Sequence, residues 1–137
     1  MVRFGAITLA VFIGLKVPVM AADSAVVMMY HRFGENTYPS TNIRIAQFEA
    51  HLKELAKSKY AVLPIPEIVA KLKARQPLPN RTVGISIDDA FLSVYRKAFP
   101  RLKKAGLPFT LFVATDPIDR KIGGYMSWDQ IRELKAA

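Results

Sequence analysis

The sequence predicts an α/β fold built on a parallel β-sheet. Two patterns predict it: apolar segments of strand length alternate with segments of helical periodicity, and the apolar segments run without interruption, as in strands covered on both faces. The 137 residues are 51% hydrophobic, which is enough for one domain with a packed core. A complete α/β barrel takes about 250 residues, so we expect about four βα units, from a truncated sequence or from the first half of a larger barrel.

The first 22 residues have the pattern of a secretory signal peptide. Arg3 provides the positive start, residues 4–15 form an apolar run, and Ala21 and Ala22 offer small residues for cleavage. The run is too short to span a bilayer comfortably. We therefore expect export to the periplasm or the extracellular space, with the domain over residues 23–137. An uncleaved anchor or a buried helix is the alternative.

The composition restricts the chemistry that the chain can perform. It has no cysteine, which excludes disulfides, thiolate catalysis and cysteine metal ligands. The net charge is +9, and the basic residues fall at helical spacings, which predicts solvated helix faces. We expect no nucleic-acid partner. Attraction to anionic envelope polymers fits the charge equally well, and contact with a membrane is expected only if the signal segment stays uncleaved.

The first half of the domain contains two predicted strand–helix units. A strand is expected over residues 25–30, and a helix over residues 45–57, where apolar residues recur at the spacing of an amphipathic helix. A second strand is expected over residues 60–65, ended by the prolines that follow Leu63. A second helix is expected over residues 67–74.

A third unit begins with the most apolar strand of the chain. This strand is expected over residues 82–87, and the helix that follows it over residues 91–105. Pro100 lies within that helix and should interrupt it, and Gly106 should end it. The unit therefore predicts a buried strand followed by an irregular helix.

The last predicted unit is a strand over residues 108–114 and a further helix. Residues 116–124 are rich in turn residues and are expected to form a loop. Ser127 followed by Gln130 has the spacing of a capping box, in which two side chains bond the first free amides of a helix. A helix is therefore expected to open at this point.

Two adjacent carboxylates, Asp88 and Asp89, follow the apolar strand over residues 82–87. In parallel α/β folds chemistry lies at the carboxyl ends of strands, where one carboxylate could bind a divalent cation and the other could take a proton from water. Neighbours on an extended strand point to opposite faces, so both reach one cavity only if the chain turns there. The alternative is structural, because aspartate is also a common helix cap.

The dyad stands in the segment "VGISIDDAF", which is followed by "FPRLKKAGLPFTLFV" and "MSWDQIRELKAA" and preceded by "MMYHRF" and "FEAHLKELAKSKYAVLPIPE". Together these segments, over residues 25–137, resemble the amino-terminal part of polysaccharide deacetylases of carbohydrate esterase family four, in its envelope-polysaccharide branch. The first family motif is Thr or Ser, Phe, Asp, Asp, Gly. Residues 86–90 read Ser-Ile-Asp-Asp-Ala at the same place.

The resemblance implies a fold, a reaction and two roles. The fold would be a partial, distorted (β/α) barrel with parallel strands. The reaction would remove acetyl groups from N-acetylglucosamine units of a polysaccharide or chitooligosaccharide, with a divalent metal, usually Zn2+, as cofactor. Asp88 would act as general base on the attacking water, and Asp89 would be a metal ligand.

The chain departs from the family pattern in two ways that bear on activity. Ala90 replaces the glycine of the first motif, and alanine is strained there if the backbone φ angle is positive. The His-x-x-x-His segment of the second motif is absent, since the only histidines are His31 and His51. A catalytic zinc site takes about three protein ligands. We therefore expect the chain as given to bind metal weakly or not at all and to be inactive.

Three further residues are candidate substrate-binding groups: Tyr30 and His31 at the end of the first strand, and Asp116 after the last strand. At the carboxyl rim of a parallel sheet they could line a glycan groove. The structural alternatives are a hydrogen-bonded histidine at His31 and a turn shaped by Asp116 before Pro117. His51 is expected to be a partly exposed helix residue.

Two other function classes remain open at this stage. A glycoside hydrolase would use Asp88 or Asp89 with a distant carboxylate and would cut the glycan instead of releasing acetate. A non-catalytic glycan-binding or scaffold half-domain would need no metal, and the missing histidines favour it for the chain as given. A His-x-x-x-His segment in sequence beyond Ala137 would favour the enzyme.

Overall fold

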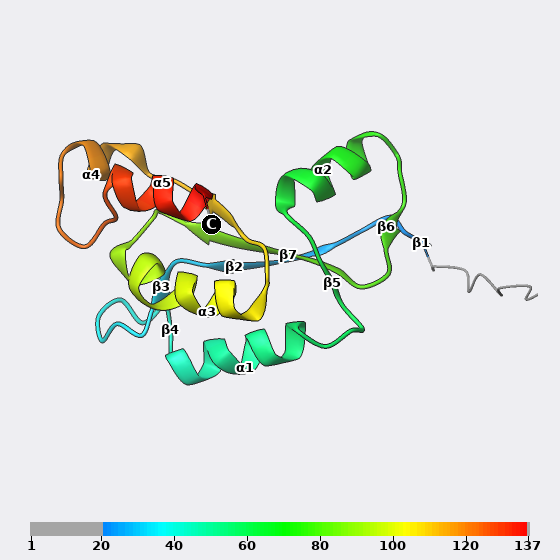
Figure 1. Ribbon diagram of the computed structural model, residues 1–137, viewed down its shortest axis with the longest axis horizontal. Coiled ribbons are helices and arrows are strands. Elements are labelled where there is room, and N and C mark those ends of the chain that lie inside the picture. The colour runs from blue at the N-terminus through cyan, green and yellow to red at the C-terminus, as the bar shows by residue number, and fades with distance from the viewer. Residues whose placement is uncertain (1–20, 137) are drawn as a thin grey trace, which may run out of the picture.

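The computed structural model describes residues 21–136 (Figure 1). The predicted signal peptide falls almost entirely on residues 1–20 and so lies outside the described residues. Within residues 21–136 we find no helix with the length and apolar character needed to cross a bilayer.

The centre of the structure is a four-stranded parallel sheet around β7 (Thr82–Asp88). One edge of β7 pairs with every residue of β2 (Val26–Tyr30). The other edge pairs with β5 (Ala61–Val62) near its start and with β8 (Thr110–Phe112) at its carboxyl end. All three pairings are parallel, which confirms the predicted α/β class. The sheet is open over the described residues.

Two pairs of very short strands flank this sheet. At one end β1 (Ala21–Ala22) pairs antiparallel with β6 (Leu78–Pro79). At the other end β3 (Arg32–Phe33) pairs in parallel with β4 (Asn42–Ile43). Sequence periodicity does not detect strands of two residues, because alternation needs a longer run.

The first two helices follow the predicted pattern with shifted ends. Helix α1 (Ile45–Leu55) buries the apolar stripe that predicted it, and it ends two residues early. Helix α2 (Ile65–Lys73) starts at Ile65, before its predicted start. The reason is Pro66, which occupies the first turn, where no backbone amide is needed. Pro66 therefore opens the helix, and β5 already ends at Val62.

The third helical segment is irregular, as Pro100 predicted. A π-helical turn, η1 (Val94–Ala98), leads into α3 (Phe99–Ala105). Pro100 has no amide to donate and would crowd the carbonyl four residues earlier, and a wider turn relieves both problems. Gly106 ends α3 in the left-handed conformation with φ of 63°, which confirms the predicted stop.

The last two helices give one correction and one confirmation. The loop predicted over residues 116–124 is wrong in its first part, where α4 (Thr115–Asp119) forms with Pro117 in its first turn. Helix α5 (Trp128–Ala136) opens as predicted. The amide of Ser127 donates to Gln130 Oε1 at 2.9 Å, and the amide of Gln130 donates to Ser127 Oγ at 3.3 Å.

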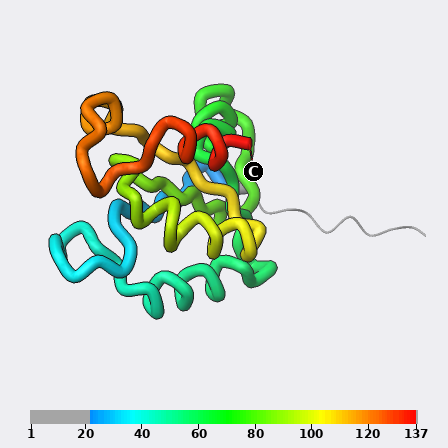
Figure 2. The backbone as a smooth tube through the Cα atoms, turned by 60° about the vertical axis from the view of Figure 1, so that its left-hand side comes forward, coloured from blue at the N-terminus to red at the C-terminus, as the bar shows by residue number. Residues whose placement is uncertain are grey.

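The two faces of the sheet are covered differently. In Figures 1 and 2 α1 and α3 lie next to each other on one side of the strands, and α2 lies on the other. Val83, Ile85 and Ile87 of β7 belong to the core cluster that α1 and α3 complete. Their neighbour Gly84 faces α2 instead, since a side chain there would meet Ile65 and Ile68.

Towards the carboxyl end this second face is open. Register places Met29 beside Ser86 and Phe112 beside Asp88, on the face opposite the core. Met29 is 63% exposed and Phe112 is 52% exposed. The prediction that strand 25–30 is covered on both faces is therefore wrong for the described structure. Beyond Met29, Val26 on the core side is 64% exposed, since β2 is an edge strand of the described sheet and α2 covers only the amino-terminal part of the second face.

Candidate active site at the carboxyl end of β7

The Asp88–Asp89 pair lies at a sharp turn at the end of β7. Asp88 is the last residue of the strand, and the next two residues, Asp89 and Ala90, have positive φ angles of 71° and 58°. Two adjacent aspartates can face one cavity only if the chain turns between them and the next residues, and this turn is present. Both carboxylates are half-buried and lie next to the open face of the sheet.

The turn carries the backbone strain that the sequence predicted for a positive φ. Ala90 is fully buried in the left-handed region, which costs an L-residue about 1–2 kcal/mol. Neighbouring backbone holds the turn in place: the amide of Met126 donates to the Ala90 carbonyl at 2.9 Å, and the amide of Leu92 donates to the Gly124 carbonyl at 2.7 Å. Strain of this kind persists where the surroundings determine the conformation.

The helix that follows is not capped by the dyad. No side chain caps η1, and the amide of Val94 donates to the Phe91 carbonyl at 2.9 Å. The capping alternative therefore finds no support, and both carboxylates remain candidates for chemistry.

His31 lies beside Asp88, directly after the neighbouring strand. Tyr30, the last residue of β2, pairs with Ile87 in register, so His31 follows β2 at the level of Asp88, the last residue of β7. His31 Nε2 is 3.9 Å from Asp88 Oδ2, which is an ion-pair distance when the imidazole is protonated but too long for a hydrogen bond. The two side chains are 22% and 27% exposed, so both can be reached from solvent.

Tyr30 is placed mostly inside the core. It is 7% exposed, and its ring packs against Phe33 and Phe48 at centroid distances of 5.7 and 5.4 Å. Its hydroxyl is hydrogen-bonded to Nδ1 of His51 at 2.9 Å. Burial raises the pKa of Tyr30 to about 12. His51 is half-buried, close to its expected exposure, and its bond to Tyr30 was not anticipated.

A hollow of about 350 Å³ lies between α1 and the β3–β4 connection. Both histidines line it, together with Tyr30 and Arg32. The rest of its lining is mixed: Met29 and Ile43 are apolar, and hydroxyl and amide side chains lie at Ser40, Thr41, Asn42 and Gln47. The hollow and the dyad are thus both bordered by His31.

Asp116 stands apart from the dyad. It lies in the first turn of α4, its side chain is 74% exposed, and it pairs with Arg120 at 3.3 Å. β8 does end beside Asp88, as a shared rim requires, but Asp116 follows four residues later. The structure gives it a surface ion pair within its own helix.

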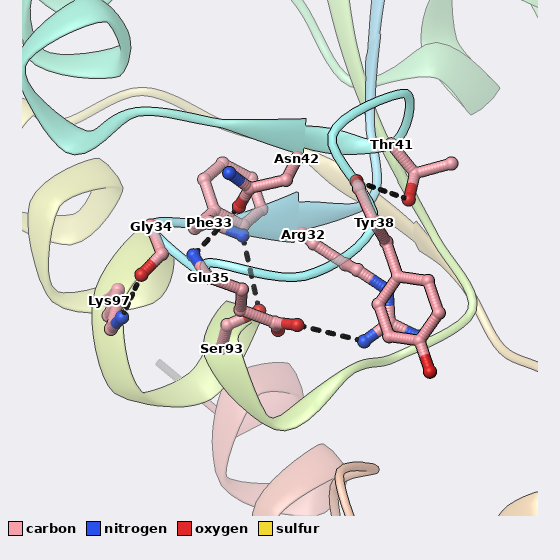
Figure 3. A network of polar contacts seen from close by, with 9 residues as sticks. All are labelled: Arg32, Phe33, Gly34, Glu35, Tyr38, Thr41, Asn42, Ser93 and Lys97. Carbon is pink, nitrogen blue, oxygen red and sulfur yellow. Dashed lines mark hydrogen bonds and ion pairs between the residues drawn. The ribbon is translucent and has the colours of Figure 1, made fainter.

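Arg32 organises the rim in a way that the sequence did not indicate. Its guanidinium carbon lies 3.5 Å from the centre of the Phe91 ring and 4.4 Å from the centre of the Tyr38 ring. Nη1 of Arg32 also donates to Glu35 at 2.9 Å (Figure 3). Stacking between residues so far apart has no spacing signature, so no sequence pattern could have revealed it.

The described residues do not by themselves fit a catalytic metal. Within residues 21–136 no group of three histidine, aspartate or glutamate side chains is arranged to hold one. A catalytic zinc takes about three protein ligands and leaves one position for water. Only His31 accompanies the two carboxylates, and His51 is bonded to Tyr30. The donor set is therefore incomplete.

Known proteins supply the remaining context. No family model matches the chain. The Bacillus subtilis protein YxkH, which is named as a polysaccharide deacetylase, is 29% identical over 108 residues, which cover 79% of this chain and 37% of that protein. A Staphylococcus epidermidis poly-β-1,6-N-acetyl-D-glucosamine N-deacetylase is 27% identical over 110 residues, covering 70% of this chain and 38% of that protein.

A solved structure agrees with these relatives. IcaB from Ammonifex degensii is 36% identical, with a TM-score of 0.73, over 85% of this chain and 50% of that one. The chain resembles the amino-terminal part of a polysaccharide deacetylase. It spans well under half the length of the two curated deacetylases and half the length of IcaB, so the match covers only part of the deacetylase fold.

Proposed function

We propose that this chain is the amino-terminal part of a hydrolase that removes N-acetyl groups from a polysaccharide containing N-acetylglucosamine. The observation that carries the proposal is the Asp88–Asp89 pair. It sits at a left-handed turn, on the carboxyl rim of a parallel sheet, in a chain similar to polysaccharide deacetylases. Carboxyl rims of parallel sheets are where such folds carry their chemistry.

Asp88 is the proposed general base. It ends β7 on the open face, its side chain is 27% exposed, and His31 Nε2 lies 3.9 Å from its Oδ2. It would take the proton of a water molecule whose oxygen attacks the amide carbonyl carbon. The carbon–nitrogen bond then breaks as the sugar nitrogen takes up the proton held by Asp88, which returns Asp88 to its ionised form and gives a free amine on the sugar and acetic acid, which ionises to acetate at neutral pH.

Asp89 is the proposed metal ligand, with zinc or another divalent ion as the metal. It offers one carboxylate, and the remaining donors would have to come from histidines that this chain does not contain. We therefore derive no reaction step through the metal. The isolated chain is expected to bind zinc weakly and to release no acetate.

The proposed fold of the whole domain is a distorted (β/α) barrel. Within residues 21–136 the outer edges of β2 and β8 pair with no further strand, which supports the barrel, because exposed parallel strands next to an uncovered apolar face call for further strands and helices. Residues 1–22 are the proposed signal peptide, residues 23–137 the proposed deacetylase part, and the product is an exported protein. The proposed partner is an N-acetylated glycan; the name of the Staphylococcus epidermidis relative supports poly-β-1,6-N-acetylglucosamine.

Zinc titration of the 137-residue chain tests the metal part of the proposal. We expect no submicromolar binding in a calorimeter, because the donor set is incomplete. Submicromolar binding that is lost in Asp89→Asn would show that the chain completes the metal site without further histidines, and would contradict the expected inactivity.

A chimera tests the chemistry. Residues 23–136 would replace the equivalent half of IcaB, and acetate release from poly-β-1,6-N-acetylglucosamine would be followed with added divalent metal. We expect release by the chimera and none by its Asp88→Asn variant, which removes the base without changing the size of the side chain. A chimera that is folded by circular dichroism yet releases no acetate would refute the proposed reaction.

A second candidate is a non-catalytic glycan-binding half-domain. The incomplete donor set favours it for the chain as given. The chimera separates the candidates, since a binding module would give a folded chimera that releases no acetate.

A further inference from the structure

The loop between β3 and β4, residues 34–41, presents a tyrosine ring beside the candidate site. Tyr38 is 60% exposed, and one face of its ring lies on the Arg32 guanidinium at 4.4 Å. The same guanidinium also lies over the ring of Phe91 at 3.5 Å, and Phe91 directly follows the Asp88–Ala90 turn. Arg32 in turn follows His31, the neighbour of Asp88. Arg32 thus connects Tyr38 to Phe91 and so to the end of β7 that carries the dyad.

The loop that carries Tyr38 is held by a dense set of polar contacts (Figure 3). The amide of Arg32 donates to the Thr41 carbonyl at 3.0 Å, and the amide of Thr41 donates to the Tyr38 carbonyl at 3.1 Å. The amide of Glu35 donates to Asn42 Oδ1 at 2.8 Å. The bonds of Arg32 and Glu35 join the two sides of the loop, and the Thr41–Tyr38 bond closes a turn within it, so the loop is fixed internally.

The helix layer anchors the same loop from below. The amide of Phe33 donates to Ser93 Oγ at 3.2 Å, and Lys97 Nζ donates to the Gly34 carbonyl at 2.6 Å. Ser93 is buried and Lys97 is half-buried, so both bonds are shielded from water. The loop therefore presents Tyr38 from a rigid base, which lowers the entropy lost when a ligand binds.

The backbone of Tyr38 is strained, which is unusual for an exposed residue unless its side chain has a role at the surface. Its φ angle is 59°, in the left-handed region that a bulky side chain rarely adopts. Its ring is also among the large apolar groups that the fold leaves exposed. A strained backbone that holds an aromatic ring in solvent, next to a reactive rim, is an arrangement that serves recognition.

We propose that Tyr38, supported by Arg32, is a stacking platform for one sugar ring of an N-acetylated glycan, next to the unit that reacts at Asp88. The exposed face of the ring suits the apolar face of a hexosamine. The hollow of about 350 Å³, bordered by Arg32, contains the hydroxyl groups of Ser40 and Thr41 from the same loop, which can bond the polar edge of the glycan. The inference rests on the proposed function for the identity of the glycan, but it concerns binding alone.

The test is an NMR titration of the 137-residue chain with β-1,6-linked N-acetylglucosamine oligomers. We expect fast-exchange binding by the chain, with saturation transfer from tyrosine ring protons to the axial C–H protons of one sugar unit. Tyr38→Ala should weaken the affinity about tenfold, and Tyr38→Phe should change it less than about twofold, because stacking needs the ring and not the hydroxyl.

Tyr60→Ala is the matched control. Tyr60 is also a tyrosine stacked on a cation, with Lys59 Nζ 4.9 Å from its ring centre, but it precedes β5 at the opposite end of the sheet. Its loss should leave the affinity unchanged. Circular dichroism of each variant verifies that the fold is retained.

Two results would overturn the inference: a chain that does not bind the oligomers, or a Tyr38→Ala variant that binds them as the unchanged chain does. Failure of the proposed function gives a different result. In that case Tyr38 still governs oligomer binding, while the folded chimera with IcaB releases no acetate.

Discussion

The two faces of the central sheet differ in what covers them: one face is packed under helices and stabilises the fold, and the other is open and carries the candidate site. On one face Val83, Ile85 and Ile87 of β7 are at most 7% exposed beneath α1 and α3. On the other face Met29 and Phe112 are more than half exposed, and Asp88 lies among them. Burial of apolar area is the main source of stability, so the covered face holds the fold together. The open face is left free to carry Asp88, the proposed general base, and to meet a ligand.

Removing a large side chain from each face gives the strongest contrast. Phe48→Ala on α1 should lower the free energy of unfolding by about 3–5 kcal/mol, because Phe48 is fully buried against the covered face. Met29→Ala should change it by about 0.5 kcal/mol or less, since Met29 is 63% exposed. Urea unfolding followed by circular dichroism measures both. Similar losses for the two variants would mean that Met29 is covered in solution and that the faces are not different.

A smaller effect is expected where α2 covers the amino-terminal part of the second face. A side chain at Gly84 would meet Ile65 at 3.0 Å and Ile68 at 3.1 Å. Gly84→Val should therefore destabilise the fold by about 1–3 kcal/mol through overpacking. Gly123→Ala is the control, because no atom lies within 4 Å of the added carbon. If Gly84→Val unfolds at the same urea concentration as the unchanged chain, α2 does not pack on this face as described.

The smallest effect concerns the polar group buried on the covered face. Tyr30→Phe should cost about 1 kcal/mol at neutral pH, because it removes the hydrogen bond to His51. Burial raises the pKa of Tyr30 from 10.0 to about 12, so the stability linked to its protonated form is complete below pH 10 and is lost as the pH rises through 12.

Unfolding between pH 9 and 12, with tyrosinate absorbance as the titration signal, measures this dependence. The alkaline loss of stability should be smaller in Tyr30→Phe than in the unchanged chain. An equal loss in both proteins would place the hydroxyl of Tyr30 in solvent and not in the core.

The elements that the sequence predicted well are those whose signal is local. Helix α1 and strand β7 follow hydrophobic periodicity, and Gly106 and the Ser127–Gln130 pair mark helix ends by their own backbone chemistry. Helix α4 was missed because a proline that opens a helix and a proline that shapes a loop look the same in sequence. The exposure of β2 was predicted wrongly because an apolar run shows only that a strand can be buried. Whether it is buried depends on which neighbouring elements cover it.

The candidate site divides in the same way. The dyad and the strained Ala90 were recognisable in the linear pattern, since the motif and its missing glycine are adjacent residues. The approach of His31 to Asp88 depends on the pairing of β2 with β7 across more than fifty residues, and the contacts of Arg32 with Tyr38 and Phe91 depend on how the β3–β4 loop packs. No spacing along the chain encodes either contact.

For this protein, the order of residues was sufficient to establish a parallel α/β class, the positions of its long elements and a carboxylate pair at the end of its central strand. These follow from periodicity, backbone sterics and residue type, which act over a few neighbouring positions. Folding in three dimensions was needed to establish which face of the sheet stays open, that His31 stands next to Asp88, and that Tyr38 rests on Arg32 beside them. Such contacts join distant segments, and their energies depend on what packs against what.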